Sequence, residues 1–415
     1  MAKGDIIVGL DIGTTKICTV IGEVADAATG RVDVLGVGVS PSTGIRRGVV
    51  VDIEITVRAI EDSIGKAQRM AGADVHSVVV GVTGEHIASL NSRGVIAITH
   101  ADREVTQEDV DRVLENSKVI VLPPDREIIH AIPRGYAIDG QNGIRSPVGM
   151  CGTRLEVETH IVHGASTFLQ NVAKCIEKSG LQVEDTVLEP IATGESVVMA
   201  AEKDLGVVLV DIGGGTSDLA IFQDGEICYT AVIPVGGQYV TKDVSAGLRT
   251  TMEEAERVKT DHGVAITAMT GEGDTFSFTR LGAHEPTVLP ARILGEIIEP
   301  RVSELFQMVK QEINRSNYAG LLPAGLVLSG GGALLKGAKE LATEITGLPT
   351  RVGFPIGMGG LAESVDNPSF ATAVGLVQWG ARAHAGMPRR ERTGSLFADL
   401  MAWTRRFFHS VKGGS

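Results

Sequence analysis

The stretch VVLVDIGGGTSDLAIF, residues 207–222, decides the fold. In it an apolar run ends at Asp211, a glycine-rich turn follows, and a second apolar run begins at Leu219. The same pattern occurs two hundred residues earlier in IIVGLDIGTTKICTVI, residues 6–21. Such duplicated strand–turn–strand units predict two similar halves that face each other across a cleft, each presenting its turn to the same ligand.

The two turns carry the chemistry of a phosphate site. Glycine lets backbone N–H groups approach phosphate oxygens, threonine hydroxyls add donors, and a carboxylate at a strand end orients Mg²⁺ through water. A lone turn of this kind is more often an ordinary hairpin turn, whereas a matched pair predicts a clamp. The chain has no G-x-x-x-x-G-K-[ST] stretch, so the phosphate site is not a Walker-type loop.

The composition is that of a globular α/β protein. The chain has 415 residues, of which 43% are hydrophobic and 52 are glycine. This length predicts a large core in two or three lobes, and glycines beside apolar runs predict tight turns at strand ends. The four cysteines are scattered without a C-x-x-C pair, so neither a disulfide framework nor a zinc site is expected, and a reducing cytoplasm is the simplest compartment.

The net charge of −13 is unevenly distributed. Residues 389–415 include six basic and two acidic side chains, so this tail is near +4 and the remainder near −17. An acidic body repels phosphate, so nucleic acid is not expected as a partner, whereas the basic tail fits a different polyanion. Residues 1–5 lack the apolar segment of a secretion signal, and no apolar run is long enough to span a bilayer.

A third glycine-rich window, LVLSGGGA at residues 326–333, also follows an apolar run and is suited to support a nucleoside. We expect a helix through residues 334–346 after it. Between the second and third windows, EAERVK at residues 254–259 places Glu256 and Lys259 on one face of a predicted helix. By themselves these two side chains are best explained as a solvated ion pair.

The order of these windows resembles that of the actin and Hsp70 ATPase superfamily, and the resemblance spans nearly the whole chain. It implies an actin-like α/β fold of two duplicated ribonuclease-H-like halves, with ATP and Mg²⁺ as ligands. Asp11 and Asp211 would orient the Mg²⁺. The phosphate-binding residues implied are Asp11, Gly13, Thr14, Thr15, Lys16, Asp211, Gly213, Gly214, Gly215 and Thr216, with Gly236 and Gly237 as a second hinge-side turn. The adenosine-binding residues implied are Glu256, Lys259, Gly330, Gly331 and Gly332.

The stretch LEPIATG, residues 188–194, resembles the connecting helix of the superfamily, whose Glu or Gln polarises the attacking water. The resemblance therefore implies a catalytic role for Glu189. A carboxylate beside a proline in the first helical turn is also favourable without any catalysis, so both interpretations remain open. We expect ATP binding with at most slow hydrolysis.

Within the superfamily, the chain is identified as a member of the bacterial FtsA family of cell-division proteins. Residues 42–52 (STGIRRGVVVD), 77–84 (SVVVGVTG) and 93–98 (RGVIAI) are similar to that family. Hsp70 chaperones need a substrate-binding domain after the ATPase, whereas only a short tail follows the last core helix here. MreB lacks both the insertion and the anchoring tail.

The resemblance implies a set of subdomains. They are 1A in residues 1–83 and 164–203, an inserted 1C in 84–163 with a helix near 107–116, 2A in 204–241 and 321–384, and 2B in 242–320. A linker over 385–394 and an amphipathic helix over 395–412 would follow. Subdomain 1C suits self-association into a filament, and an inert insertion is the alternative.

The tail indicates a membrane surface by its own physics. A helix over residues 395–412 places its large apolar side chains within an arc of roughly 160°, at about 100° per residue, interrupted only by Thr404. Its other side is cationic, which suits anionic lipid headgroups, and its charges exclude a spanning helix. Docking on the protein's own core is the alternative. The expected membrane-binding residues are Leu396, Phe397, Leu400, Met401, Trp403, Arg405, Arg406, Phe407, Phe408 and Lys412.

These features predict an ATP-binding protein that polymerises on the cytoplasmic side of the inner membrane at the division septum. One such helix binds reversibly, but the helices of a filament act together. The resemblance implies that subdomain 2B binds the C-terminal peptide of FtsZ, the tubulin-like division protein, and that the chain links the Z ring to later divisome membrane proteins. On a predicted helix over 292–314, Arg292, Arg301 and Lys310 would meet acidic groups of that peptide.

Two other functions share the same nucleotide site. An actin-like assembly ATPase of a type IV pilus system would also have an insertion, but generally no amphipathic tail. A sugar or acetate kinase of the same superfold would hold a second substrate in the cleft, and a phosphotransfer assay on small substrates would reveal it.

Overall fold

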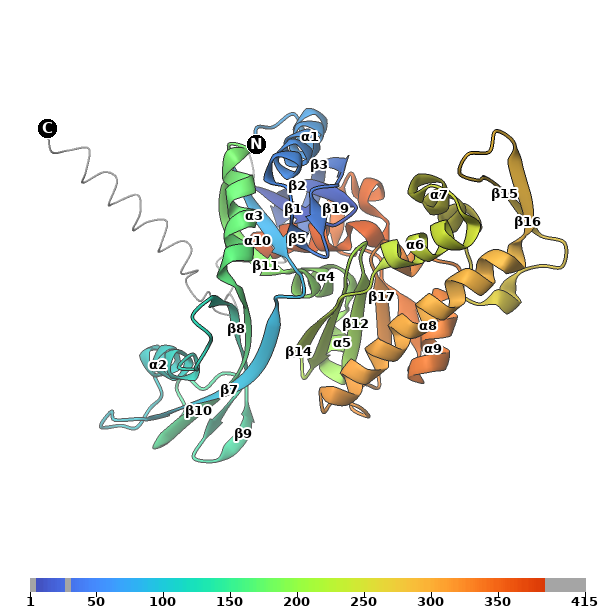
Figure 1. Ribbon diagram of the computed structural model, residues 1–415. Coiled ribbons are helices and arrows are strands. Elements are labelled where there is room, and N and C mark those ends of the chain that lie inside the picture. Colours follow the sequence, from blue (N-terminus) through green and yellow to red (C-terminus); the bar gives the residue numbers. More distant parts are fainter. Residues whose placement is uncertain (1–4, 27–30, 385–415) are drawn as a thin grey trace, which may run out of the picture.

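The structure is a computed structural model that describes residues 5–26 and 31–384. Two lobes, each built on a mixed sheet with helices packed against it, lie side by side, and an additional small domain extends from the first lobe (Figure 1). No helix in the described ranges has the length and apolar character needed to cross a bilayer.

The first lobe is built on a six-stranded sheet. Its central strand β1 pairs antiparallel with β2 and parallel with β6. The strands, in spatial order, are β11 (Gln182–Leu188), β6 (Ser77–Val82), β1 (Ile6–Ile12), β2 (Lys16–Asp26), β3 (Arg31–Pro41) and β19 (Met358–Gly360). The helices packed with this sheet are α1 (Ile53–Ala71), α3 (Ser166–Lys178), α4 (Glu189–Val197) and α10 (Ala371–His384).

The second lobe repeats the strand order of the first. Its strands, in spatial order, are β14 (Glu226–Ile233), β13 (Ser217–Gln223), β12 (Val207–Ile212), β17 (Leu326–Ser329) and β18 (Thr350–Val352). The central strand β12 pairs antiparallel with β13 and parallel with β17, as β1 does with β2 and β6. The predicted duplication into two similar halves is therefore confirmed.

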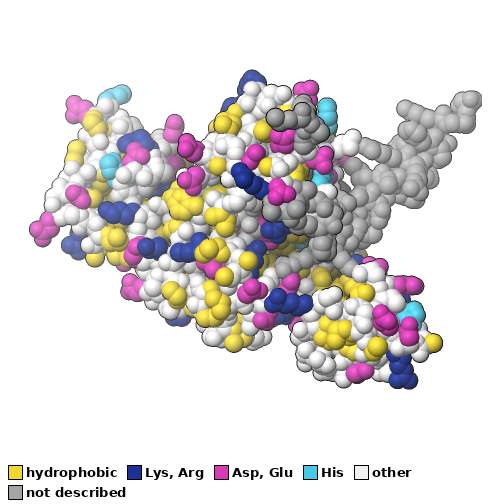
Figure 2. Space-filling model, turned by 180° about the vertical axis from the view of Figure 1, so that it is seen from behind, with side chains coloured by type: hydrophobic (Ala, Val, Ile, Leu, Met, Phe, Trp, Pro, Cys, Tyr) yellow, Lys and Arg dark blue, Asp and Glu magenta, His cyan; other side chains and the backbone are white. Residues whose placement is uncertain are grey.

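The additional domain lies between β6 and α3 in the sequence and has a sheet and a core of its own. The core includes Val113, Leu114 and Leu155. Seen from behind, this domain stands out as a rounded body beside the two lobes (Figure 2). Its elements are β7 (Ala88–Ala97), α2 (Gln107–Ser117), β8 (Arg126–Ile138), β9 (Gln141–Ile144) and β10 (Arg154–Ala165), with sheet order β7-β10-β8-β9.

A helical excursion follows β14 in the second lobe and ends in a protruding hairpin (Figure 1). The long helix α8 contains Pro300, and it runs one residue beyond each end of the predicted 292–314. The elements of this region are α6 (Gly237–Leu248), α7 (Met252–His262), the 3₁₀ turn η1 (Thr267–Met269), β15 (Thr275–Thr279), β16 (Pro286–Pro290) and α8 (Ala291–Arg315).

The helix expected over 334–346 starts later than predicted. A 3₁₀ turn, η2 (Gly331–Leu334), follows β17, and the helix α9 begins only at Ala338 and ends at Thr346. The reason is Gly337, whose φ of 83° lies in the left-handed region and cannot continue a right-handed helix. The remaining elements are α5 (Ala200–Leu205), β4 (Ile45–Arg46), β5 (Val49–Val50), η3 (Ala362–Val365) and η4 (Pro368–Phe370).

The helices α4 and α10 cross at very close range between the two lobes. A Cβ added to Gly375 of α10 would lie 1.8 Å from the backbone oxygen of Ala192 in α4. Only glycine permits this approach, because any side chain would overlap the neighbouring backbone. The crossing fixes the start of α4, and with it Glu189, relative to both sheets.

Candidate functional site

A cavity of about 1230 Å³ lies between the two lobes. All three glycine-rich windows line it, as do the predicted catalytic residue and the predicted adenosine pair. The predicted residues that line this cavity are Asp11, Gly13, Thr14, Thr15, Lys16, Glu189, Asp211, Gly213, Gly214, Gly215, Thr216, Gly236, Gly237, Glu256, Lys259, Gly330, Gly331 and Gly332. Segments that are hundreds of residues apart in the chain thus meet at one site.

The two predicted phosphate turns touch each other. A Cβ on Gly214 would lie 2.5 Å from the Thr15 side chain, and one on Gly215 would lie 2.5 Å from Thr14 Oγ1. The hinge-side turn joins the second phosphate turn, since Gly237 N–H donates to Gly213 O at 2.9 Å. The backbone of both lobes therefore approaches the same volume, as a clamp on a polyphosphate requires.

The third window packs directly against the second. Gly330 has a φ of 77°, and a Cβ there would lie 2.3 Å from Asp211 Oδ1. Gly332 meets Ile212 in the same way, with its added Cβ 2.3 Å from that side chain. These glycines are needed for the close approach of η2 to β12, whereas a Cβ on Gly331 would be 3.9 Å from its nearest neighbour, Ser369.

Four carboxylates gather at the centre of the cavity. Burial raises the pKa of Asp11 to about 6, with Lys16 opposing and Asp211 adding to the shift. Burial raises the pKa of Asp218 to about 7 and that of Asp211 above its usual range. Burial, followed by the charges of Asp11, Asp218 and Asp211, also raises the pKa of Glu189 well above its usual value. Such crowding favours binding of a cation, which would relieve the repulsion between the carboxylates.

Hydroxyl groups from both lobes orient two of these carboxylates. Thr193 of α4 and Thr372 of α10 donate to Asp211 Oδ2 at 2.6 and 3.0 Å. Asp218 accepts from Thr83, at the end of β6, and from Thr216 at 3.1 Å. The Asp218 bond with Thr83 joins the second lobe to the first.

The side chain of Lys16, at the end of the first phosphate turn, is held by residues of η4. Its Nζ donates to Ser369 O and lies 4.5 Å from the centre of the Phe370 ring. Its positive charge lowers the pKa values of Asp11 and Asp211 against the effect of burial. One lysine thus offsets part of the negative charge of the four carboxylates.

The donor set fits Mg²⁺ bound together with a polyphosphate. In residues 5–26 and 31–384, no three His, Cys, Asp or Glu side chains converge to hold a metal ion by themselves. Mg²⁺ commonly takes only one or two carboxylates and completes its shell with waters and phosphate oxygens. Asp11 and Asp211, buried with raised pKa values, provide such a pair.

The helix α7 presents the predicted adenosine pair to the cavity. Lys259 Nζ lies 2.7 Å from Glu256 Oε2 and donates to Thr241 Oγ1 at 3.0 Å, while Thr241 donates to Glu256. The ion pair expected from the sequence is present, but it is fixed by α6 and lines the cavity instead of standing alone in solvent.

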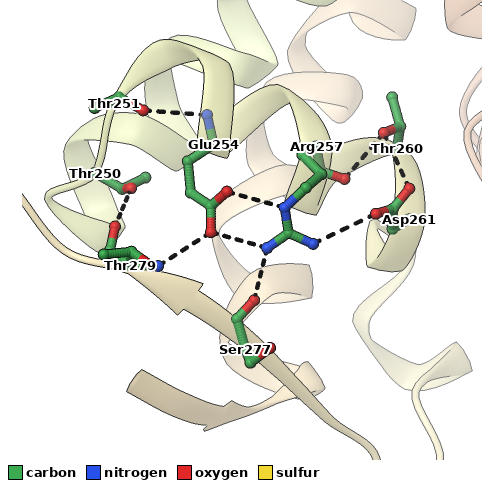
Figure 3. Close-up of polar contacts among 8 residues, drawn as sticks. All are labelled: Thr250, Thr251, Glu254, Arg257, Thr260, Asp261, Ser277 and Thr279. Carbon is green, nitrogen blue, oxygen red and sulfur yellow. Dashed lines mark hydrogen bonds and ion pairs between the residues drawn. The ribbon is translucent and has the colours of Figure 1, made fainter. Parts of the chain in front are cut away.

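The opposite face of α7 is tied to the protruding hairpin (Figure 3). Arg257 makes two bonds to Glu254, at 2.8 and 2.9 Å, and also donates to Ser277 O at 3.0 Å. Glu254 in turn accepts from Thr279 N–H at 3.0 Å. These contacts use backbone groups on the outer edge of β15, so the hairpin holds α7 in place against the cavity.

The three cations proposed to meet a partner peptide do not form one surface. At about 100° per residue, positions nine apart on α8 point to opposite sides. Arg301 lines the cavity and pairs with Asp243 at 2.6 Å and with Glu304. Arg292 pairs with Glu296 at 2.9 Å, and Lys310 donates to Ile345 O at 2.7 Å.

The linker over 385–394 and the expected membrane-binding residues between Leu396 and Lys412 lie outside the described residues. Their sequence pattern remains the basis for that prediction.

Sequence reasoning missed several residues of the site. Asp218 is the most consequential: it faces Asp211 directly in the β12–β13 register. That pairing was accessible, because two strands joined by a short turn bring Asp211 and Asp218 opposite each other. Thr83, Thr193 and Thr372 gave no comparable signal, since single threonines at strand ends and in helices are common.

Comparison with family models gives two matches. The model described as "Cell division protein FtsA" matches residues 208–375, and the model "SHS2 domain inserted in FTSA" matches residues 84–163. The second range coincides with the additional domain between β6 and α3.

Solved structures with the same fold include several actin-like proteins. The PilM–PilN type IV pilus biogenesis complex has a TM-score of 0.67 at 17% identity, over 90% of this chain and 98% of that chain. MreB5 of Spiroplasma citri bound to ADP has a TM-score of 0.55 at 13% identity, over 89% and 94%. The predicted actin-like α/β fold is therefore confirmed.

Full-length relatives are more similar in sequence. The cell division protein FtsA of Pseudomonas aeruginosa is 44% identical, with 96% of this chain and 94% of the relative covered. That of Neisseria meningitidis is 42% identical, over 96% and 98%, and that of Escherichia coli K12 is 35% identical, over 97% and 98%. An identity of this size over nearly the whole length establishes the family: this chain belongs to the FtsA family of cell division proteins.

Proposed function

We propose that this chain binds ATP and Mg²⁺ in the cavity between its lobes. The observation that carries the proposal is the contact between the two glycine turns beside four carboxylates, of which Asp11, Asp211 and Asp218 are buried. MreB5 structures bound to ADP and to AMPPNP have the same fold, which supports an adenine nucleotide as the ligand. Asp11 and Asp211 would hold the Mg²⁺, which would neutralise phosphate charge when bound.

Each proposed residue has a distinct task in this site. The backbone of Gly13 to Lys16 and of Gly213 to Thr216 would donate to phosphate oxygens, and Gly236 and Gly237 would brace the second turn. Glu256 and Lys259 would hold the ribose, while Gly330 to Gly332 leave room for the base.

We propose Glu189 as the residue that orients an attacking water. It is the first residue of α4, and its side chain lies among the other carboxylates of the cavity. Its raised pKa favours the protonated form until a cation is bound, so activation and loading of the site would be linked. Hydrolysis would be slow at most.

We propose that the chain polymerises on the cytoplasmic face of the inner membrane through contacts that include the additional domain. The subdomain boundaries given above are part of this proposal, except that β19 and α10, expected with residues 321–384 in 2A, pack on the sheet of the first lobe. The amphipathic pattern of residues 395–412 supports attachment to anionic lipid, and a filament would engage many such helices at once. Assembly and attachment would therefore strengthen each other.

Membership of the FtsA family supports divisome partners. We propose that the region of residues 242–320 binds the C-terminal peptide of FtsZ and so tethers its filaments, and that the chain links them to later division proteins. Arg292 and Lys310 share one side of α8 and Arg301 lies on the other. A reversal of charge at each, measured for peptide binding, separates these two sides.

Two measurements test the central proposal. Equilibrium titration with ATP in the presence and absence of Mg²⁺ should give saturable binding that is lost in Asp11→Asn and Asp211→Asn variants. A wild-type chain that does not bind ATP would contradict the proposal. Co-sedimentation with liposomes containing anionic lipid should steepen with protein concentration when ATP is present. Binding that stays linear in a chain seen to form filaments contradicts the link between assembly and attachment.

A further inference from the structure

The hairpin β4–β5 joins β3 to α1 at the rim of the cavity. Its strands pair Ile45 with Val50 and Arg46 with Val49, which leaves a two-residue turn of Arg47 and Gly48. Both turn residues are left-handed, with φ of 51° and 73°. This is the geometry of a type I′ turn, whose backbone is tightly constrained.

The backbone of this turn touches the phosphate turns of both lobes. Gly48 N–H donates to Thr14 Oγ1 at 3.2 Å, and a Cβ added to Gly215 would lie 3.0 Å from Arg47 Cα. On its other side, a Cβ on Gly48 would lie 2.9 Å from Thr83 O. Thr14 and Thr83 belong to the first lobe and Gly215 to the second, so the turn bridges the cavity.

The side chain of Arg47 extends this bridge to the helix α6 of the second lobe. Its guanidinium lies 5.5 Å from the centre of the Tyr239 ring, which belongs to α6 of the second lobe. It also forms an ion pair at 2.8 Å with Glu85, in the segment that leads from β6 into the additional domain. Hydrogen bonds to Glu85 and Tyr239 raise the pKa of Arg47, so it carries its charge at every physiological pH.

Arg47 and Tyr239 are not themselves part of the cavity wall formed by the described residues, although the residues that the turn touches are. At the rim, the contact between Arg47 and Tyr239 can restrain the movement of the two lobes without touching a ligand in the cavity. Separation of the lobes at this rim has to break the Arg47–Tyr239 contact.

We propose that the Arg47 turn is a latch across the phosphate end of the cavity, and that its contact with Tyr239 sets the rate at which bound nucleotide leaves. This inference rests on the proposed nucleotide function. The latch slows release without blocking it, because the pair is partly exposed: the side chain of Arg47 retains 42% of its solvent exposure. Exposed cation–π contacts are modest in strength, which corresponds to an effect of about two- to fivefold on a rate.

The test is the release rate of a fluorescent ATP analogue from the full-length chain, preloaded with Mg²⁺ and chased with excess ATP in a stopped-flow instrument. Arg47→Ala and Tyr239→Leu should each speed release about two- to fivefold. The Tyr239 ring also lies 4.9 Å from Lys242 Nζ and 5.8 Å from the Arg301 guanidinium, so Tyr239→Leu removes more than the Arg47 contact. The double variant should therefore release at the rate of Tyr239→Leu, because Arg47→Ala then has no ring contact left to break. Release of the ADP analogue should accelerate by the same factor, since the latch does not contact the terminal phosphate.

A matched control accompanies these variants. Arg46→Ala removes the neighbouring exposed arginine of the same hairpin and leaves the contact between Arg47 and Tyr239 in place, so it should release at the wild-type rate. Circular dichroism and thermal melts check that each variant is folded.

Each remaining outcome is decisive. Unchanged release in folded Arg47→Ala and Tyr239→Leu variants overturns the latch, while the wild-type chain still binds nucleotide. Faster release of the ATP analogue alone also overturns it, because Arg47 would then be a ligand of the terminal phosphate. A wild-type chain that does not bind either analogue overturns the proposed function, and the latch with it.

Discussion

At the scale of single residues, the two halves of the site differ at one decisive position. Asp11 faces Cys18 across the β1–β2 hairpin, and Asp211 faces Asp218 across the equivalent β12–β13 hairpin. Burial raises the pKa of Cys18 to about 12, so this thiol stays neutral, whereas Asp218 adds a carboxylate beside Asp211. The hairpin of the second half therefore supplies two of the four carboxylates, whereas the hairpin of the first half supplies one.

The carboxylate of Asp218 should make stability depend on pH. Its pKa is raised from 3.8 to about 7 in the folded chain, so the folded state binds the extra proton between these values. The stabilisation from this proton is complete below about pH 4 and is lost as the pH rises through about 7. We expect wild type to lose stability relative to Asp218→Asn over this range in the presence of EDTA, as measured by urea unfolding.

Asn at this position is a suitable comparison because its side-chain oxygen still accepts a hydrogen bond from Thr83. Addition of Mg²⁺ and ATP should reduce the pH dependence of the wild type, because a bound cation favours the charged carboxylates. A stability difference between the two proteins that is constant from pH 4 to 7 would contradict the raised pKa.

Glu189 offers a second prediction at this scale. Its replacement by Gln keeps the size of the side chain but removes the ability to accept a proton. We expect single-turnover hydrolysis of ATP to fall about a hundredfold, with the dissociation constant for ATP changed little. If hydrolysis persists at the wild-type rate, Glu189 is only a favourable first-turn carboxylate of α4, the alternative that its position beside Pro190 left open.

At this scale, a site residue could be predicted from the sequence only where its neighbours in the chain form a recognisable motif. Gly213, Gly214 and Gly215 follow a strand directly, so their role could be predicted from the turn itself. Thr193 and Thr372 are brought to Asp211 by the packing of α4 on α10, and these two threonines are 179 positions apart in the chain. No local pattern carries such a contact, because it depends on the crossing of two helices.

At the scale of elements, the geometry of the site depends on the crossing of α4 and α10. The helix α4 carries Glu189 and Thr193, and α10 carries Thr372. Both helices lie in the core shared by the two lobes, beside Phe222 of β13. A change in their separation therefore moves ligands from both halves of the site together.

A methyl group at Gly375 should separate these helices. Gly375→Ala places a Cβ 1.8 Å from Ala192 O, which is not possible without movement of the backbone. We expect a loss of about 1–3 kcal/mol in the free energy of unfolding, and weaker ATP binding because Thr372 is displaced from Asp211. Urea denaturation and nucleotide titration measure the two effects.

The matched control is Gly65→Ala in α1, where the added Cβ meets only the end of the Arg69 side chain at 3.3 Å. Alanine is the better helix former, so this variant should be unchanged or more stable by about 0.5–1 kcal/mol. Equal losses in both variants would show that the effect is not specific to the helix crossing.

The ends of helices with a regular apolar spacing could be predicted from the sequence. Helix ends that depend on the conformation of one turn residue could not. The helix α8 extends only one residue beyond each end of the predicted 292–314, and its buried residues recur at the spacing of a regular helix. The start of α9 was misplaced because GGALLKG resembles a helix start in composition, whereas the left-handed Gly337 postpones the helix. A glycine at that position does not by itself reveal the sign of its φ.

At the scale of the whole molecule, the additional domain is attached to both lobes. It continues from β6 and returns through β10 to α3 in the first lobe. Against the second lobe, Asn91 of β7 donates to Cys228 O at 3.4 Å, and Ser89 donates to Thr230 O at 2.9 Å. Asn91 and Cys228 are 137 positions apart, so the sequence predicted the domain but not this seam against the edge strand β14.

A buried histidine closes the seam. Burial lowers the pKa of His160 to about 3, so the ring is neutral and has one donor and one acceptor. Its Nδ1 lies 2.7 Å from Asn91 Oδ1, which can only accept, so this nitrogen carries the proton. Its Nε2 therefore accepts from the hydroxyl of Thr230 at 3.1 Å. Because this chain of bonds runs from the additional domain to β14, any rotation of the lobes has to strain or break it.

Thr230→Val should loosen this seam without changing the shape of the side chain. The substitution leaves Nε2 of His160 buried without a donor, which costs about 1–3 kcal/mol. We expect hydrogen exchange to become faster in β7, β10 and β14, while protection of the phosphate turns and of α8 stays the same, because the bond that is lost joins only β10 to β14. In the His160→Phe background the same substitution should have a smaller effect, since the nitrogen that it leaves unpaired is then absent. Faster exchange throughout the molecule would instead mean that the additional domain and the lobes open as one unit.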